Sequence, residues 1–516
     1  MAAHDRIQPL PQRFVALVLS ASLASCVSQP EIDGVPGAPA TPSTPWTVPP
    51  SVATPPPAPV PPTARPVSDA LHADSARIAS QSNISMTDVI DIALRNNPAT
   101  RESWATARVA GDQYGSALGA IYPTVNGSVN FTHTATSAAS VSGTTVGGND
   151  TTSNVRGTGG AGISRTQITP ALSLSYLVFD LGGRAGTIEA AKQRAIASNL
   201  THNATIQDVV LQAEASVFGY LAARALRDAQ VIAVQEAQAD TAAAEARMRL
   251  GVATLEEVLQ TRTALAQAKL QLATLRGDLL NARAALASAM GIPANARFEV
   301  PDITASDSVR AIAASVDTLI NRAITLRPEL AQVRAEASAL ASDIRVAQSA
   351  RYPSLTLSST TTFPQQIQGT GTSVTGRNLS VVLGLQVPLF NGLAREYDLR
   401  AARDAHEAGL ARVEAMRLQI GVQVFTSYAA LQTATDRVQA SVELLTAARQ
   451  SSEVAVGRYR EGVGTIVDVL LARSALTTAR AAEVQARWQW RIALAQLAHD
   501  VGALDTRGRP NIPLRP

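Results

Sequence analysis

The sequence predicts a mainly α-helical protein with a small membrane β-barrel portion, built from two similar repeats. Three observations predict this fold class: a motif pattern that occurs twice, two very long alanine-rich segments without proline, and four shorter segments of alternating apolar and polar residues. Apolar residues make up 46% of the 516 residues and aromatic residues only 4%, which favours closely packed helices over a large aromatic core. The net charge is +3 without a basic tract, so nucleic-acid binding is not expected.

The duplication is visible as matching residues at constant offsets. Early in each repeat the offset is 230 residues, as for Tyr122-Pro123 and Tyr352-Pro353. Later the offset is 211 residues, as for Arg184 and Arg395, Arg247 and Arg458, Gly251 and Gly462, Thr254 and Thr465, and Gly291 and Gly502. The two offsets differ by 19 residues, which places a variable insertion in the first repeat between Pro123 and Phe179. Two similar halves of this length are expected to pack as quasi-equivalent parts of one assembly.

The N-terminus has the pattern of a lipoprotein signal peptide. Arg6 and Arg13 precede an apolar run of about 11 residues, which is too short to span a bilayer. The run ends in Leu23-Ala24-Ser25-Cys26, which resembles the lipobox whose cysteine becomes the acylated first residue of the mature protein. Cys26 is the only cysteine, so an internal disulfide is excluded, and an ordinary buried cysteine is the alternative. Because Val27 rather than aspartate follows, the resemblance implies lipid attachment in the bacterial outer membrane.

These signals divide the chain into six parts. Residues 1–25 are a signal peptide, and residues 26–78 are a tether, because dense proline favours extended polyproline II. The other parts are a first repeat over 79–291, a linker over 292–315, a second repeat over 316–502 and a C-terminal tail over 503–516. Each repeat is expected to run as helix, β-hairpin, long helix, tip turn and return helix, with hairpins at 123–180 and 353–391 and tips near 251 and 462.

Four segments alternate apolar and polar residues with the period of a β-strand. Each is roughly ten residues long, as a tilted membrane-spanning strand requires. Aromatic residues cluster at the strand ends, where an aromatic girdle would lie: Tyr122, Tyr176, Phe179, Tyr352, Phe363 and Phe390. Stretches rich in serine, threonine and glycine, 137–162 and 364–377, are expected loops. A soluble β-sandwich face is the alternative interpretation.

Two proline-free, alanine-rich segments predict very long helices. They span Arg184–Arg249 and Arg395–Arg460, 66 residues each, which corresponds to about 100 Å of helix. They stop at Gly251 and Gly462, and helical periodicity resumes after three more residues, so each forms an antiparallel helical hairpin with the helix that follows. A shorter helix is expected to begin at Thr87, a candidate cap.

Together these pieces resemble the TolC family of outer-membrane efflux and secretion channels, over roughly residues 80–503. The most specific match is the second tip, Tyr459-Arg460-Glu461-Gly462-Val463-Gly464-Thr465-Ile466-Val467-Asp468-Val469-Leu470, together with Phe390-Asn391-Gly392 after a strand. The resemblance implies a homotrimer in which each chain gives four strands to one 12-stranded barrel and the helices form a periplasmic tunnel. Four strands alone leave edges that cannot face lipid, and symmetry-related copies would close the ring.

The resemblance implies a periplasmic gate at the tips. Glu257 and Asp468 occupy matching places, and threefold symmetry would arrange each as a ring of carboxylates that favours cations. Tyr459 matches the tyrosine that bridges neighbouring coiled coils and holds the family's gate closed. The family's basic partner is replaced by Gly464 and a second acid by Leu471. The candidates that replace the basic partner are Arg247, Arg249, Arg458 and Arg460. A solvated helix face is the alternative for these charges.

The tips are also where the family docks a periplasmic adaptor, or membrane fusion protein. That adaptor connects the channel to an inner-membrane transporter of the RND or ABC type. The matching residues here are Gly251, Val252, Gly462, Val463 and Gly464. Glycine allows a partner backbone to approach closely, and a plain turn glycine is the alternative.

The expected function is therefore an outer-membrane channel of a tripartite export system for small molecules such as drugs and toxic compounds. Two alternatives stay open: the exit duct of a type I protein secretion system, and a periplasmic coiled-coil lipoprotein scaffold without a pore. Nothing in the sequence selects the cargo. The six histidines are scattered and no nucleophile–base or metal-ligand spacing occurs, so neither an enzyme nor a bound cofactor or metal is expected.

Overall fold

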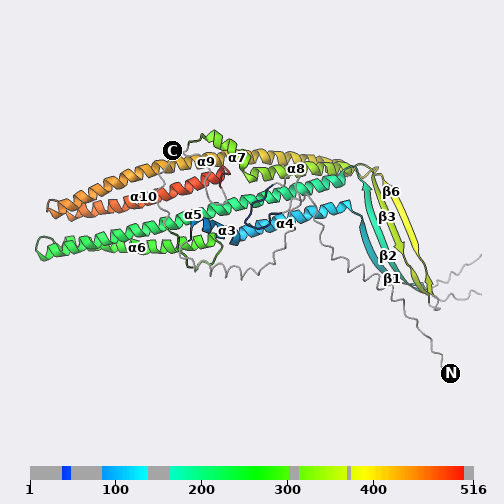
Figure 1. The fold of residues 1–516 in the computed structure, drawn as a ribbon, viewed down its shortest axis with the longest axis horizontal. Coiled ribbons are helices and arrows are strands. Elements are labelled where there is room, and N and C mark those ends of the chain that lie inside the picture. Colours follow the sequence, from blue (N-terminus) through cyan, green and yellow to red (C-terminus); the bar gives the residue numbers. More distant parts are fainter. Residues whose placement is uncertain (1–37, 48–83, 137–162, 302–312, 369–372, 505–516) are drawn as a thin grey trace, which may run out of the picture.

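Two long helical hairpins lie side by side, and a single sheet extends from one end of them (Figure 1). The computed structural model describes residues 38–47, 84–136, 163–301, 313–368 and 373–504. In the first hairpin, α5 (Gly183–Arg249) is followed by α6 (Leu255–Ala289). In the second, α9 (Ala394–Arg460) is followed by α10 (Ile466–Asp500). The mainly helical fold class predicted from the sequence is confirmed, and α5 and α9 each begin one residue earlier than expected.

Shorter helices precede the strands in each repeat. They are α3 (Met86–Asn96) and α4 (Pro98–Leu118) in the first repeat, and α7 (Val316–Leu326) and α8 (Pro328–Ser349) in the second. Proline at the first helical position starts α4 and α8, because that position needs no backbone N–H donor. The prediction that Thr87 caps the first helix is wrong: Ser85 is the cap and forms a capping box with Asp88.

The four long strands are β1 (Thr124–Thr136), β2 (Ile163–Phe179), β3 (Ser354–Thr362) and β6 (Asn378–Gln386). They pair antiparallel in the order β1-β2-β3-β6. The expected loop over 364–377 instead contains two short strands, β4 (Gln365–Gln368) and β5 (Ser373–Thr375), which extend the β2 edge. The other expected loop, 137–162, lies outside the described residues.

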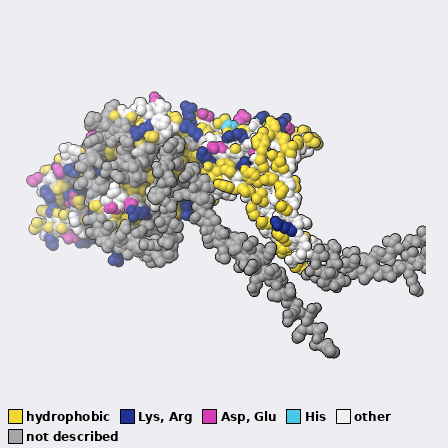
Figure 2. Space-filling view, turned by 45° about the vertical axis from the view of Figure 1, so that its right-hand side comes forward, with side chains coloured by type: hydrophobic (Ala, Val, Ile, Leu, Met, Phe, Trp, Pro, Cys, Tyr) yellow, Lys and Arg dark blue, Asp and Glu magenta, His cyan; other side chains and the backbone are white. Residues whose placement is uncertain are grey.

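The strand register gives the sheet one apolar and one polar face. Val125 pairs with Leu174, Leu174 with Ser359, and Ser359 with Val381, while the next row is Asn126, Ser173, Thr360 and Ser380. Large apolar side chains are exposed along this sheet, including Val129 at 70% and Leu383 at 64%, and Figure 2 shows them as a continuous apolar surface. Within the described residues β1 pairs only with β2, and of the two edges of β6 only one is paired, with β3.

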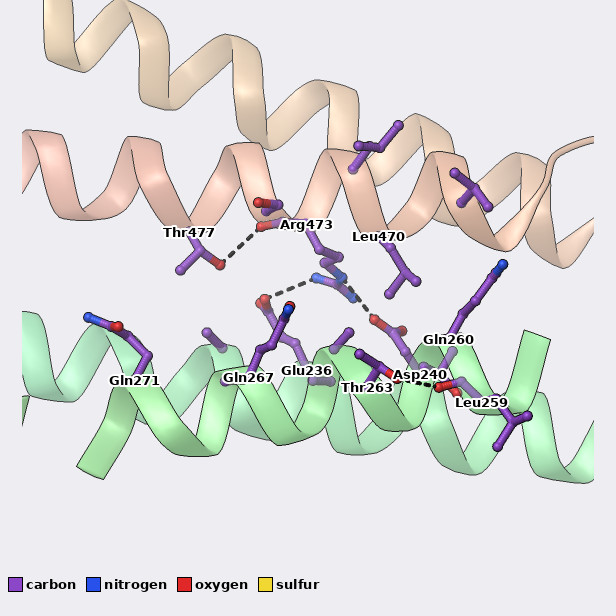
Figure 3. A pocket seen from close by; sticks show the side chains of 18 of the residues that line it. Glu236, Asp240, Leu259, Gln260, Thr263, Gln267, Gln271, Leu470, Arg473 and Thr477 are labelled. Atoms are coloured by element: carbon purple, nitrogen blue, oxygen red, sulfur yellow. Dashed lines mark hydrogen bonds and ion pairs between the residues drawn. The ribbon is translucent and has the colours of Figure 1, made fainter. Parts of the chain in front are cut away.

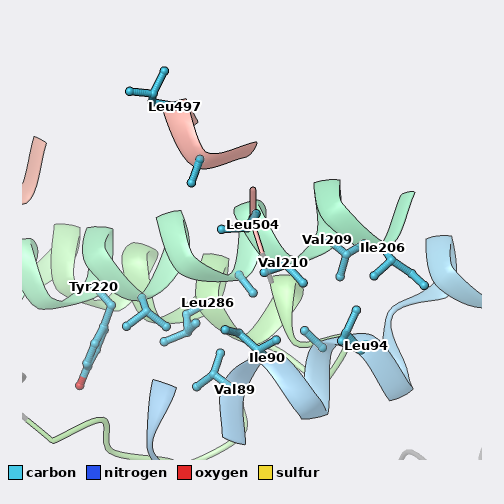
Figure 4. Close-up of a cluster of buried hydrophobic side chains, with 14 of the residues drawn as sticks. Val89, Ile90, Leu94, Ile206, Val209, Val210, Tyr220, Leu286, Leu497 and Leu504 are labelled. Atoms are coloured by element: carbon cyan, nitrogen blue, oxygen red, sulfur yellow. The ribbon is translucent and has the colours of Figure 1, made fainter. Parts of the chain in front are cut away.

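The core lies where the short helices meet the long ones, away from the sheet (Figure 4). Ile90 of α3, Ile206 of α5, Leu286 of α6 and Leu497 of α10 are each at most 1% exposed. Each such side chain contributes about 1.5–3 kcal/mol by leaving water. The expected linker over 292–315 begins inside this core, because Phe298 and Val300 are buried in it.

Residues 38–47, part of the expected tether, dock on the helical body. The Trp46 side chain is 7% exposed, and its backbone N–H donates to Asn203 Oδ1 of α5 at 2.6 Å while Asn203 Nδ2 donates to the Trp46 carbonyl at 2.8 Å. The Trp104 indole of α4 donates to the Pro39 carbonyl at 2.7 Å. This part of the proline-rich segment is therefore bound rather than free. Cys26 and the expected signal peptide lie outside the described residues.

Candidate functional site at the helical tips

Both hairpins turn at their tips through a glycine in the left-handed region. Gly251 has φ +75° and Gly462 has φ +77°, a conformation that L side chains rarely adopt. Backbone hydrogen bonds close each turn: Val252 N donates to the Arg247 carbonyl at 3.0 Å, and Val463 N donates to the Arg458 carbonyl at 2.9 Å. The same turn chemistry explains why the two glycines are repeated at the offset of 211.

The tips expose apolar side chains. The side chains of Leu250, Val252 and Val463 are 79%, 61% and 66% exposed. A side chain added at either turn glycine would meet no atom within 4 Å. At Gly464, in contrast, an added Cβ would lie 3.1 Å from Arg458 Cβ and 3.2 Å from the Tyr459 backbone nitrogen. Gly464 therefore packs against the end of α9, while the two turn glycines have open space beside them.

Three of the expected gate residues come together between the two hairpins. The Tyr459 hydroxyl of α9 donates to Glu257 Oε2 of α6 at 3.1 Å. Arg247 of α5 donates from Nη1 to the Tyr459 carbonyl at 3.1 Å, and its guanidinium lies 4.6 Å from the centre of the Tyr459 ring. Burial and then the hydrogen bond to the Glu257 carboxylate raise the pKa of Tyr459, so the phenol stays protonated as the donor. Arg247 is thus the arginine, of the four candidates, that reaches the tyrosine.

Glu257 and Asp468 match in sequence but differ in their contacts. Asp468 closes a capping box: its Oδ2 accepts from Thr465 N at 3.1 Å and from Thr465 Oγ1 at 2.8 Å. The backbone hydrogen bond and then the side-chain hydrogen bond from Thr465 lower the pKa of Asp468, whose carboxylate is solvent exposed. In the first repeat, Thr254 caps α6 but the Glu257 carboxylate extends to Tyr459 instead. The two repeats therefore use equivalent acids for different contacts.

A charge cluster that the sequence analysis did not single out lies farther from the tips, in a groove of about 1110 Å³ between α5, α6 and α10 (Figure 3). Arg473 of α10 contacts Glu236 at 3.2 Å and Asp240 at 3.3 Å on α5. Arg480, two turns farther along α10, donates to both Glu236 carboxylate oxygens at 3.1 and 3.0 Å. The sequence does contain a signal for this cluster. The two acids are four residues apart and the two arginines seven apart, and these spacings place each pair on one face of its helix.

Among the described residues, no group of three or more histidine, cysteine, aspartate or glutamate side chains is arranged to hold a metal ion. The chemistry of the tips consists of turn glycines, exposed apolar side chains, a tyrosine–carboxylate hydrogen bond and ion pairs between hairpins. These groups lie in the part of the molecule farthest from the two-faced sheet (Figure 1).

The sequence pattern of the outer membrane efflux protein family matches this chain over residues 89–292 and 319–503. The chain belongs to this family. Each matched segment corresponds to one of the two repeats. Together the two segments include the helical hairpins, the strands and both tips. The family and the fold are those of channel proteins of the outer membrane.

Curated relatives match along most of their length. The chain is 26% identical over 432 residues to the protein CyaE of Bordetella pertussis, covering 83% of this chain and 86% of CyaE. It is 23% identical to the outer membrane efflux protein BepC of Brucella suis, covering 81% and 85%. It is 29% identical over 350 residues to the pyoverdine export outer membrane protein OpmQ of Pseudomonas aeruginosa, covering 65% and 69%.

Solved structures give the same fold. The outer membrane protein VceC of Vibrio cholerae superposes with a TM-score of 0.66 at 19% identity, covering 81% of this chain and 96% of VceC. The outer-membrane channel MtrE of Neisseria gonorrhoeae, solved in its open state, gives 0.64 at 18% identity, covering 81% and 88%. The predicted TolC-like architecture of a helical tunnel joined to barrel strands is therefore confirmed.

Proposed function

We propose that this protein is the outer-membrane channel of a tripartite export system that carries small molecules from the periplasm or an inner-membrane pump to the exterior. The single observation that carries the proposal is the sheet, which among the described residues has one apolar face, one polar face and an unpaired edge at each side. Such a sheet fits a barrel wall with lipid outside and water inside. The similarity to OpmQ, a pyoverdine export protein, favours small molecules over proteins as cargo.

Closure of the barrel requires further copies of the chain. Unpaired strand edges cannot face lipid, because each free N–H and C=O group would remain without a hydrogen bond. A homotrimer supplies twelve long strands, enough to leave an aqueous pore lined by the polar row of serine, threonine and asparagine side chains. Tyr122, Phe179, Tyr352 and Phe390, each more than half exposed, stand at the helical end of the strands, where a barrel meets the membrane interface.

The proposed partners are a periplasmic adaptor at the helical tips and lipid at the N-terminal segment. We assign the adaptor-docking surface to the tips Gly251-Val252 and Gly462-Val463-Gly464, and the gate to Glu257, Asp468 and Tyr459. The adaptor would connect these tips to an inner-membrane transporter of the RND or ABC type. Acylation of Cys26 would attach the docked N-terminal segment to the outer-membrane lipid.

Adaptor docking is tested by adding bulk at the second tip. Gly462→Trp is expected to reduce export of a fluorescent dye at least tenfold while heat-modifiable trimers persist, because the indole fills open space that a partner backbone would need. Gly462→Asn is the control, since asparagine tolerates the left-handed region without comparable bulk. Normal export by the tryptophan variant would contradict docking at this tip.

The carboxylate rings are tested by ion selectivity. The double variant Glu257→Gln and Asp468→Asn is expected to shift the reversal potential of the pore in a salt gradient toward lower cation preference, because two rings of charge are lost. Glu245→Gln, which removes a carboxylate that pairs with Arg262 between α5 and α6, is the control for charge removal. A reversal potential equal to that of the unmodified channel would remove these residues from the gate.

A further inference from the structure

The two repeats of the chain are joined side by side near the sheet. β2 of the first repeat pairs antiparallel with β3 of the second, and α5 of the first repeat packs on α8 of the second (Figure 1). We name these two contacts together the inner junction. In the described part of the chain, β1 and α4 form one side of this arrangement, and β6 and α9 form the other (Figure 1).

The duplication relates the strands of one repeat to those of the other. The offset of 230 residues relates β3 to β1, and the offset of 211 residues relates β6 to β2. Ser354 and Gln386 pair in the second hairpin, and the two offsets convert them into Thr124 and Ser175, which pair in the first hairpin. The two hairpins therefore have the same register, and the offsets hold within the sheet.

The same offsets transfer the strand pairing of the inner junction to the unpaired edges of the sheet. β2 becomes β6, and β3 becomes β1 of a neighbouring copy. The resulting pairs include Leu385 with Val129 and Leu383 with Phe131, and these four side chains are 64–70% exposed in the single chain. Each apolar residue thus meets another apolar residue, whereas a slip of one residue would set it against the polar row.

The helices beside the sheet pack closely at the inner junction. Gly183 and Gly186 of α5 lie against α8, and a Cβ added at Gly183 would lie 3.0 Å from Ser349 Cβ. A Cβ added at Gly186 would lie 3.0 Å from Val346 Cγ2. At this contact the long helix therefore has no side chains, and the short helix supplies the bulk.

The equivalent positions at the two open sides have the opposite sizes. On α9 the two glycines are replaced by Ala394 and Tyr397, and the Tyr397 side chain is 62% exposed. On α4 the valine and the serine are replaced by Ser116 and Gly119. A Cβ added at Gly119 or at the neighbouring Gly115 would meet no atom within 4 Å. The bulk is therefore on the long helix, and the short helix has room for it.

We propose that copies of this chain join by repeating the inner junction. β6 pairs with β1 of the next copy, with Leu385 opposite Val129, and Tyr397 of α9 packs over Gly115 and Ser116 of the next copy. This rests on the proposed trimeric channel and gives its interface a register and an aromatic anchor. The partner is a second copy because the opposite sides of one chain supply both the complementary strands and the complementary helices. Three such contacts close a ring.

The first test is a disulfide between copies. The equivalent Cβ positions at the inner junction are 3.0 Å apart, and a disulfide needs about 3.5–4.5 Å. Mild oxidation of the double variant Gly119→Cys and Ala394→Cys is expected to produce covalent dimers and trimers on a non-reducing denaturing gel. Gly119→Cys with Ala401→Cys is the matched control, because Ala401 lies on the same face of α9 about 10 Å farther along. The single variants show any disulfide formed through Cys26.

The unmodified protein separates failure of this interface from failure of the channel. If the unmodified protein conducts as a trimer but the double variant gives only monomer bands, the proposed interface is wrong and the proposed channel stands. Equal crosslinking of the control pair would also overturn the interface. An unmodified protein that is monomeric and forms no pore would overturn the proposed function, and this interface with it.

The second test measures the strand register. Val129→Cys with Leu385→Cys is expected to be joined between copies by a short thiol crosslinker, because directly opposite Cβ atoms lie about 4.5–5.5 Å apart. Val125→Cys with Leu385→Cys is the control, since four residues displace the thiol by about 13 Å along the strand. Crosslinking of the control that equals or exceeds that of the predicted pair would overturn the register.

The third test exchanges the sizes at the helix contact. Ser116→Val is expected to raise the dissociated fraction of the trimer roughly tenfold, which corresponds to about 1.4 kcal/mol. Adding Tyr397→Gly copies the glycine–valine contact of the inner junction, and it should restore the fraction to within about twofold, because contacting residues do not act additively. Thr106→Val is the control, since its equivalent on α8, Glu336, is exposed. A double variant that dissociates more than Ser116→Val would overturn the packing of Tyr397.

Discussion

Replacement of Gly291 by alanine is expected to prevent the chain from folding into a stable structure. Gly291 ends the first return helix with φ +68°, and an added Cβ would lie 2.7 Å from the Asn96 carbonyl carbon and oxygen. These are backbone atoms at the end of α3, so they cannot move aside as a flexible side chain would. Left-handed strain of about 1–2 kcal/mol and overpacking of about 1–3 kcal/mol together approach the stability of an ordinary domain.

A series of glycine variants separates strain from overpacking. Gly251 has a similar φ of +75° but open space around it, so Gly251→Ala is expected to lose only the strain contribution. Gly502, the repeat equivalent of Gly291, would place a Cβ 3.1 Å from Leu326 Cβ and 3.3 Å from Arg327 N, which predicts an intermediate loss. The measurement is the thermal midpoint of unfolding. Equal losses at Gly251 and Gly291 would contradict the packing argument.

Replacement of His499 by glutamine is expected to destabilise the protein at neutral pH by about 3 kcal/mol. His499 is buried near the end of α10 and contacts Asp208 of α5 from Nε2 at 2.9 Å and Asp500 from Nδ1 at 3.1 Å. Burial alone would lower its pKa, but the hydrogen bonds and charges of the two aspartates raise the pKa from 6.5 to about 9. A shift of this size corresponds to roughly 3 kcal/mol in favour of the folded imidazolium.

The direction of the pKa shift determines the pH range in which His499 stabilises the protein. Because the folded pKa lies above the unfolded value, the contribution of His499 is fully present below pH 6.5 and is lost as the pH rises through about 9. The difference in thermal midpoint between the unmodified protein and His499→Gln should therefore shrink over that interval. Leu497→Val, which shortens a buried side chain without removing a titratable group, is the control, and its difference should not change over that interval. A difference that stays constant from pH 6 to 9.5 would contradict a charged His499.

Local features of the chain were readable from sequence. Proline-free, alanine-rich composition predicted α5 and α9 to within one residue, because helix propensity and the glycine stop signal act locally. The alternation in the strands predicted the two faces of the sheet, since period-two patterning follows from the backbone alone. The repeated Gly291 and Gly502 were visible as matches, but only the structure shows that each allows a close backbone approach.

Contacts between segments far apart in the chain could not be predicted from the sequence. Tyr459 and Glu257 are 202 residues apart and Arg480 and Glu236 are 244 apart, and no local rule pairs them. Asp468 was predicted as a gate acid, and its carboxylate also hydrogen-bonds Thr465 in a capping box, a contact already indicated by the spacing of Thr465 and Asp468. The docking of residues 38–47 had one clue, a tryptophan inside a proline-rich stretch, because a large aromatic side chain favours burial.

The central claim is that the two-faced sheet of one chain is a third of a barrel wall around a pore. Its most direct test is the conductance of the purified full-length protein in planar bilayers, measured on a detergent-extracted preparation whose mass is determined in parallel. The account predicts a heat-modifiable trimer that produces discrete single-channel steps. A stable monomer that stays soluble without detergent and never conducts ions would contradict it.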